Sequence, residues 1–162
     1  MSFNQARVVE AIRAIENGEI VVVTDDNDRE NEGDLIVAAT HCTPEKMAFI
    51  VRHTSGIVCT PMPRSEAKRL NLTAMVAEND APHETAFTVT VDYKHGTTTG
   101  ISADDRTLTV RNLANPMQVQ QTLYAQDTSS RLLRVKAVFS CVRVIQKRLW
   151  ICVNLQTYLL LA

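Results

Sequence analysis

The last 46 residues of this 162-residue sequence contain no glycine and no proline, although each occurs five times up to Pro116. A folded segment of that length normally takes its turns from these two residue types. The charge changes at the same point. Residues 1–116 carry eleven basic and seventeen acidic residues, a net −6, whereas residues 117–162 carry six basic and one acidic residue, a net +5. The sequence therefore divides into a body, 1–116, and a tail, 117–162.

Other absences exclude whole classes of protein. The net charge of −1 leaves no basic excess for binding nucleic acid. The four cysteines are too widely spaced for a zinc ribbon, and in the cytosolic protein that we expect they should be free thiols. The uncharged apolar stretch 149–162 is shorter than the roughly 20 residues of a membrane span. The first residues lack the basic and apolar regions of a signal peptide. We expect a cytoplasmic protein that binds neither nucleic acid nor a membrane.

With 45% hydrophobic and 22% charged residues, the chain is suited to one globular domain. Helical and strand patterns alternate in the body without a regular βαβ repeat, which predicts an α+β (irregular α/β) fold with a mixed sheet flanked by helices. Capping and periodicity predict helices from the Ser2 cap to Gly18 and over 44–52, 65–70 and 103–115. Apolar runs predict strands over 19–24, 35–39, 56–60 and 87–92, with Pro61 ending the third. In the fourth, apolar residues alternate with threonine and aspartate, which predicts one face in water.

The segment Asp25–Asp34 carries six carboxylates in ten positions. Such a cluster repels itself unless cations or hydrogen bonds offset the repulsion, and a hard divalent ion with oxygen ligands does so directly. Arg29 within it either holds an anionic substrate or neutralises its neighbours. The alternative is a solvated acidic loop without a ligand.

Four blocks of sequence resemble the 3,4-dihydroxy-2-butanone 4-phosphate synthase family of riboflavin biosynthesis. They are DDNDRENEGDLIVAA (25–39), HTSGIVCTPM (53–62), NDAPHETAFTVTVD (79–92) and HGTTTGISADDRTLTVRNLANP (95–116). They occur in the family's order and cover nearly all of the body. The resemblance implies the family's fold, incomplete at the C-terminus, with a truncated synthase-like domain over 1–116.

The resemblance also implies an activity and a site. The family is a formate-releasing lyase that converts ribulose 5-phosphate to 3,4-dihydroxy-2-butanone 4-phosphate, uses Mg²⁺ or Mn²⁺, and forms homodimers with sites near the subunit interface. By motif position, Glu30 is the metal ligand. The implied catalytic residues are Glu30, Glu32, Asp34 and Cys59, and the implied substrate contacts include Asp25, Arg29, Glu30 and Asp34.

The chemistry requires residues of these types. A carbon-bound proton must be removed by a base such as a carboxylate, and a metal stabilises the resulting enediolate. The phosphate needs donors, for which Thr98 and Thr99, with Thr97 and Ser102, precede a predicted helix. The alternative is an ordinary polar turn with an N-cap. For Cys59 the alternative is a small core residue. His53, His83 and His95 are expected to be local hydrogen-bonding residues rather than metal ligands.

The family's later motifs, which include a metal-binding histidine, are absent from the tail. Codons read two bases out of step allow Tyr124–Arg131 to encode Arg-Pro-Gly-His-Ile-Phe-Pro, and Arg143–Cys152 to encode Gly-His-Thr-Glu-Ala-Ser-Val-Asp-Leu. We interpret the tail, 117–162, as a non-family, out-of-frame product of a family gene. Because such a segment was not selected to fold, we expect no defined packed structure there.

Two functions are compatible with these observations. The first is the synthase activity, with little or no turnover in this chain because part of the metal site is missing. The second is a non-catalytic fragment that keeps affinity for Mg²⁺ and sugar phosphate. A fused cyclohydrolase domain, as in some members of the family, is a further possibility for the intact gene.

Overall fold

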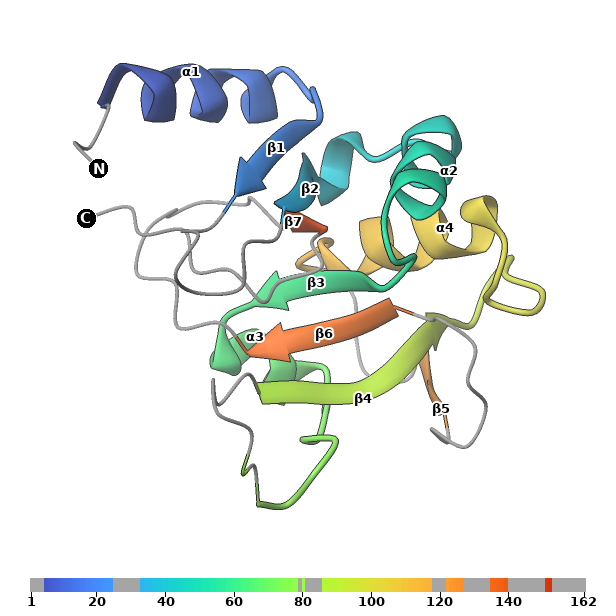
Figure 1. Cartoon of the computed structure of the whole chain (residues 1–162). Helices are drawn as coiled ribbons and strands as arrows, with labels where there is room; N and C mark the ends of the chain where they lie inside the picture. The colour runs from blue at the N-terminus through green and yellow to red at the C-terminus, as the bar shows by residue number, and fades with distance from the viewer. Residues whose placement is uncertain are drawn as a thin grey trace.

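The computed structural model describes residues 5–24, 33–78, 80, 86–117, 122–126, 135–139 and 151–152. Helices and strands are mixed along the chain, and helices lie beside two small sheets (Figure 1), which confirms the α+β prediction. The elements are α1 (Gln5–Glu16), β1 (Val21–Thr24), β2 (Gly33–Ala38), a 3₁₀ turn η1 (Ala39–His41), α2 (Pro44–His53), β3 (Val58–Met62), α3 (Arg64–Arg69), β4 (Ala86–Tyr93), α4 (Ala103–Leu113), β5 (Leu123–Gln126), β6 (Val135–Phe139) and β7 (Ile151–Cys152).

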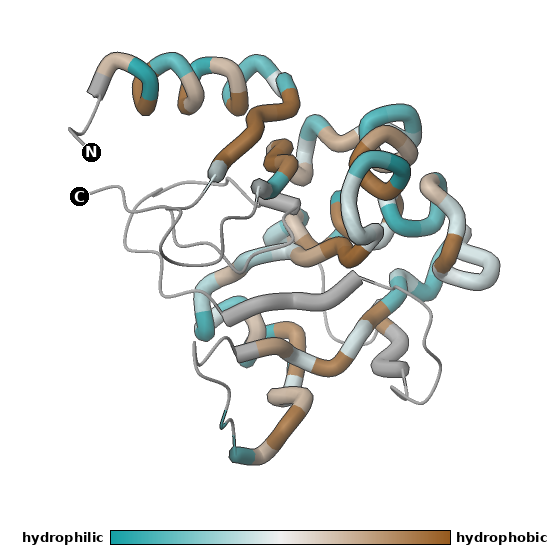
Figure 2. Tube along the Cα trace, in the orientation of Figure 1, coloured by the Kyte–Doolittle hydropathy of each residue, from teal (hydrophilic) through white to brown (hydrophobic). Residues whose placement is uncertain are grey.

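The first sheet has the order β1-β2-β7, and both pairings are antiparallel. β1 and β2 form a ladder in which Val21 lies opposite Ile36 and Thr24 opposite Gly33. Buried Ile15 of α1 packs with Ile36 and Ala38 of β2, so the helix covers one face of this sheet. Figure 2 shows the helix alternating between hydrophilic and hydrophobic residues and β1 almost wholly hydrophobic. The acidic segment therefore joins two paired strands.

The second sheet has the order β3-β6-β4-β5. β6 is parallel to β3 and antiparallel to β4, and β5 is antiparallel to β4. The main core gathers residues from β2, α2, β3, α3, β4 and α4. Its fully buried members include Val37, Met47, Val58, Leu70, Val91, Val110 and Leu113. This shared core fixes α4 relative to β3 and β4.

The helix boundaries follow capping chemistry. Thr43 is the N-cap of α2, with Pro44 in the first turn, and the Thr43 hydroxyl accepts a bond from the backbone N–H of Lys46. Ser102 is the N-cap of α4.

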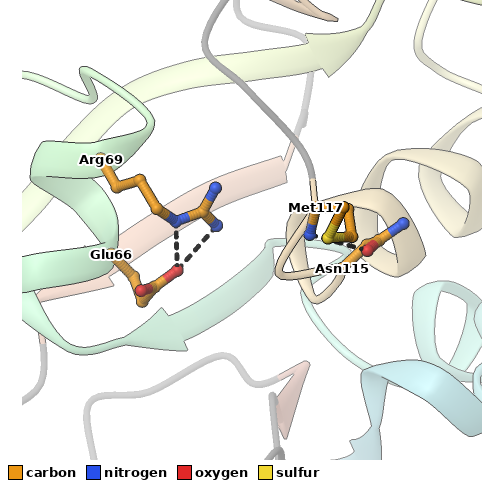
Figure 3. Close-up of polar contacts among 4 residues, drawn as sticks. All are labelled: Glu66, Arg69, Asn115 and Met117. Carbon is orange, nitrogen blue, oxygen red and sulfur yellow. Dashed lines mark hydrogen bonds and ion pairs between the residues drawn. The ribbon is translucent and has the colours of Figure 1, made fainter.

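In α3, Arg69 Nε donates to Glu66 Oε2 at 2.8 Å, and beyond α4 the Met117 N–H donates to Asn115 Oδ1 at 3.0 Å (Figure 3).

Two strand predictions need correction. Thr88, Thr90 and Asp92 of β4 are buried, so this face is not in water. The segment around Ala74 pairs with Thr88, and the turn before α4 lies against Asp92. β3 runs through Pro61 to Met62, instead of ending before Pro61. It is an edge strand, where a residue without an N–H is tolerated.

The expectation that the tail has no packed structure is wrong for its described segments. Within 117–162, β5, β6 and β7 all pair with strands of the body, and β6 lies between β3 and β4. Backbone hydrogen bonds in a ladder depend little on side-chain identity, so the unusual composition of the tail does not prevent its segments from pairing. The prediction remains untested for the other residues of the tail, which lie outside the described residues.

Candidate functional site

The predicted site residues fall into two groups. Asp25, Arg29, Glu30 and Glu32, together with His83, lie outside the described residues. Asp34, Cys59, Thr98 and Thr99 are described: Asp34 lies in β2, Cys59 in β3, and both threonines in the turn between β4 and α4.

Asp34 belongs to a strand rather than to the acidic loop in which its position in the sequence placed it. It is the second residue of β2, lies opposite Val23 of β1, and is only 3% exposed. A carboxyl group in such surroundings is desolvated, which is a common property of functional acids. The structure thus places a buried acid next to the point where the acidic segment enters the sheet.

Cys59 is the second residue of β3, is fully buried, and forms no disulfide. Its backbone position pairs with Lys136 of β6. Cys42, the other described free thiol, is also fully buried, and burial raises its pKa to about 11. The prediction of free thiols is confirmed for these two cysteines.

The two threonines lie in the turn between β4 and α4, which the Asp105 carboxylate organises. The Thr98 N–H donates to Asp105 Oδ1 at 3.0 Å, and the Thr98 hydroxyl donates to Oδ2 at 2.9 Å. The Gly100 N–H also donates to Oδ2, at 3.0 Å. Although burial alone raises the pKa of Asp105, these hydrogen bonds outweigh it and hold the pKa below its usual range.

Arg106, which the sequence analysis did not identify, links this turn to the segment before β3. Its Nε donates to the Ile101 carbonyl at 2.9 Å, and one of its terminal nitrogens donates to the Gly56 carbonyl at 3.0 Å. Gly56 precedes β3, which carries Cys59. The sequence offered one signal for Arg106. It lies near the start of a predicted helix, where acidic residues are favoured, so a basic residue there indicates a specific contact.

The described site residues do not form one cluster. In Figure 1 the yellow turn before α4 lies at the right of the view, whereas β1 and β2, which flank the acidic segment, lie toward the upper left. Within the described part of the chain, no group of three or more His, Cys, Asp or Glu side chains could hold a metal ion. His53 packs its ring on Phe49, and His95 packs on Tyr93; these are ring contacts and not the hydrogen bonds expected for these histidines.

Two further features lie apart from these residues. A surface hollow is lined by Ala6, Val9, Glu10 and Arg13 of α1, and its described lining includes none of the predicted site residues. Of the helices that the structure describes, none has the length and apolar character needed to cross a bilayer.

Comparison with known proteins decides the family. The family model for 3,4-dihydroxy-2-butanone 4-phosphate synthase matches residues 9–132. The chain belongs to this family. The match takes in β1, β2, β3 and the turn before α4, and it continues 16 residues past Pro116, where the motif resemblance ends.

Individual members of the synthase family resemble the body closely. A 3,4-dihydroxy-2-butanone 4-phosphate synthase of Candida albicans is 56% identical over 109 residues, which are 67% of this chain and 53% of that protein. A bifunctional riboflavin biosynthesis protein of Arabidopsis thaliana, named as chloroplastic, is 58% identical over 110 residues, or 67% of this chain and 20% of that protein. The chain thus spans about half of the first relative and a fifth of the second.

Solved structures of synthases share the fold. A crystal structure of a 3,4-dihydroxy-2-butanone 4-phosphate synthase in complex with two magnesium ions superposes with a TM-score of 0.80 at 38% identity, over 90% of this chain and 73% of that one. A structure of the Candida albicans enzyme superposes with a TM-score of 0.70 at 46% identity, over 82% and 62% of the two chains.

Proposed function

We propose that this chain carries the body of a 3,4-dihydroxy-2-butanone 4-phosphate synthase, which converts ribulose 5-phosphate to 3,4-dihydroxy-2-butanone 4-phosphate and formate in riboflavin biosynthesis. The observation that carries the proposal is the family match over residues 9–132, which spans every predicted site residue. The reaction removes one carbon from the five-carbon sugar phosphate, which places the enzyme among the lyases.

The acidic segment is the proposed place for a divalent ion, Mg²⁺ or Mn²⁺. A synthase of known structure binds two magnesium ions. Glu30 is the proposed ligand, because carboxylate oxygens are the donors that these hard cations prefer. When bound, the ion would stabilise negative charge on the oxygens of the substrate.

The other predicted residues receive roles that match their chemistry. Arg29 and Asp25 would orient the sugar phosphate, and Glu32 and Asp34 are the proposed proton-transfer groups. Asp34 is buried where the acidic segment enters β2, which is compatible with this assignment. Cys59 would line the site, and Thr98 and Thr99 would belong to the turn that receives the phosphate.

We also propose that the site is completed in a homodimer. The turn before α4 and the strands that flank the acidic segment lie on different sides of one chain (Figure 1). A single substrate molecule would contact both groups most simply where two copies meet. A cytoplasmic location is likewise proposed; it rests on the sequence, and some plant relatives are named chloroplastic.

The activity expected of this chain depends on whether the tail carries the family's C-terminal motifs. We propose that residues 117–162 are translated out of frame, so that the family's C-terminal metal-binding histidine is missing. The expectation is little or no turnover. Resequencing the gene around the codons for Pro116–Tyr124 tests the frame directly.

A formate assay with ribulose 5-phosphate and Mg²⁺ tests the activity. This chain should release formate at or near background, and a chain with the frame restored should release it readily. In the restored chain Glu30→Ala should abolish release, whereas Asp26→Asn, a nearby change without an assigned role, should preserve most of it. A restored chain without activity would overturn the proposed function, and robust release by the present chain would overturn the proposed impairment.

The alternative function is a non-catalytic module that binds Mg²⁺ and sugar phosphate. The six carboxylates between Asp25 and Asp34 favour it, because they persist whatever the frame of the tail. Calorimetric titration of this chain with Mg²⁺ and then ribulose 5-phosphate separates the two. Binding without formate release supports the module, and absence of binding removes it.

A further inference from the structure

The turn between β4 and α4 is fixed by one buried carboxylate. Asp105 is 4% exposed, and its two oxygens accept three hydrogen bonds, from the N–H and hydroxyl of Thr98 and from the N–H of Gly100. Its own N–H donates to Ser102 Oγ at 3.0 Å. A single side chain therefore ties together both sides of the turn and the start of the helix.

The turn has little freedom to adopt another shape. Gly100 has a φ of 74°, and a Cβ atom there would overlap the carboxylate of Asp92, which is itself buried. At the other end of the turn, the Thr97 hydroxyl donates to the carbonyl of Tyr93. The backbone between these two points is held on both sides.

Arg106 extends the same support to a second segment. It is 4% exposed and bonds the carbonyls of Ile101 and Gly56, the latter 50 residues away in sequence. Because the fork of a guanidinium is rigid, the two bonds set the distance between the turn and the segment that leads into β3. The adjacent residues Asp105 and Arg106 thus hold two parts of the predicted site in fixed relation.

These contacts distinguish three consecutive threonines. Thr97 and Thr98 use their hydroxyl groups to hold the turn. Thr99 is exposed, and it makes no hydrogen bond to the residues that the structure describes. Only the third threonine therefore keeps its donors for a ligand.

Resting on the function proposed above, we infer that Asp105 and Arg106 are positioning residues of the sugar-phosphate site and that Thr99, rather than Thr98, makes the contact. Asp105 is negatively charged and accepts bonds from the turn, so it acts on the phosphate through the turn and not by touching it. Fixing the donors before the ligand arrives lowers the ordering cost of binding.

Asp105→Asn tests the first residue with a matched control next to it. Asparagine offers one acceptor oxygen, so its amide nitrogen must face the N–H of either Thr98 or Gly100. Asp104→Asn removes the same charge from the same helical turn at an exposed position. Amide hydrogen exchange at Thr98 and Gly100 should accelerate about tenfold or more in Asp105→Asn and stay unchanged in Asp104→Asn.

The affinity for the sugar phosphate shows whether Asp105 acts on binding through Thr99. The Kd of the full chain for ribulose 5-phosphate with Mg²⁺ should rise about tenfold in both Asp105→Asn and Thr99→Val, as expected for one lost hydrogen bond to a charged group. In the Thr99→Val background, Asp105→Asn should add little. Arg106→Lys should weaken binding, whereas Arg111→Lys, at an exposed position near the end of the same helix, should not.

The outcomes separate this inference from the proposed function. If wild type binds the sugar phosphate and Asp105→Asn leaves exchange or affinity unchanged, the positioning role is overturned and the proposed function stands. An equal loss of affinity from Asp105→Asn with and without Thr99 overturns the assignment of Thr99. These affinities are measured in the chain with its frame restored, because the present chain is proposed to lack part of the metal site. If that restored chain binds no sugar phosphate, the proposed function falls, and the role of Thr99 falls with it.

Discussion

At the scale of single residues, burial decides which groups are chemically available. Cys42 lies in the main core, and burial raises the pKa of its thiol to about 11. Thiolates, not thiols, are the reactive species, so a buried thiol of this kind is inert near neutral pH. Cys59 is equally buried. A family resemblance gives the position of a cysteine in the sequence but does not show whether its thiol is buried.

We therefore expect Cys42 to resist alkylation in the native protein. With iodoacetamide at pH 8, its modification should be at least about a hundredfold slower than in urea, because the folded state offers neither access nor thiolate. Peptide mass spectrometry resolves Cys42 from Cys59. Native modification of Cys42 at the rate found in urea would show that its part of the core opens freely.

Asp105 should make stability depend on pH. Hydrogen bonds hold the pKa of this carboxyl below its usual range, so its contribution is present above the ordinary aspartate pKa of about 3.9 and is lost as the pH falls through the lower folded value. Urea unfolding between pH 6 and pH 3 should show a steeper loss of stability in wild type than in Asp105→Asn. Asp104→Asn provides the charge control, and parallel curves for wild type and Asp105→Asn would contradict the assignment.

At the scale of elements, the connection from α1 to β1 depends on a close approach. Gly18 has a φ of 81°, and a Cβ atom there would lie 2.9 Å from His41 Cβ. Lys46 Nζ donates to the Gly18 carbonyl at 2.6 Å and to the His41 carbonyl at 3.0 Å, so the same point also links α2 to the turn. Both the backbone conformation and the space favour glycine.

Gly18→Ala should therefore destabilise the protein by about 1–3 kcal/mol, from the left-handed backbone and the contact with His41. Gly33→Ala in β2 is the matched control. A Cβ at Gly33 would meet its neighbours at 3.6 Å or more, so this change should be neutral or stabilising by up to about 1 kcal/mol. Chemical denaturation measures both, and equal effects would show that the turn relaxes around the new methyl group.

The sequence predicted elements well where the signal is local and poorly where it is not. Thr43 with Pro44, and Ser102 with Asp105, fix helix starts by bonds within one turn, and the structure has both. The polar face of β4 was expected in water, because alternation shows that a face is polar but not what covers it. Asp92 is buried through a turn that folds back on it, a contact outside any local pattern.

The candidate site shows the same division. Motif order correctly identified the family, and donor chemistry pointed to the threonine turn. The structure adds that Thr98 is already bonded to Asp105 and that Arg106 reaches Gly56. A partner 50 positions away leaves no periodic trace in one sequence. Asp34 was assigned to the acidic loop because it is charged, whereas it is the second residue of β2.

At the scale of the whole molecule, the tail contributes strands to both sheets: β7 to the first, and β5 and β6 to the second. β6 lies between β3 and β4, so its backbone groups face a neighbouring strand on each side. Burying an unpaired backbone N–H or C=O group costs free energy. A strand that lies between β3 and β4 and pairs with both therefore stabilises the sheet. The described strands of the tail thus contribute through their backbone, whatever frame their codons came from.

Ala137→Pro tests this contribution. Ala137 lies opposite Thr60 in the β3–β6 ladder, and in a central strand every N–H faces one neighbour or the other. Proline removes the N–H from the ladder and introduces a ring into a central strand, so stability should fall by about 1–3 kcal/mol, with faster hydrogen exchange in β3 and β4. Ala137→Ser, which keeps the backbone N–H at the same position, is the control. If both variants unfold at the wild-type urea concentration, β6 adds nothing to the sheet, and the body holds β3 and β4 together without it.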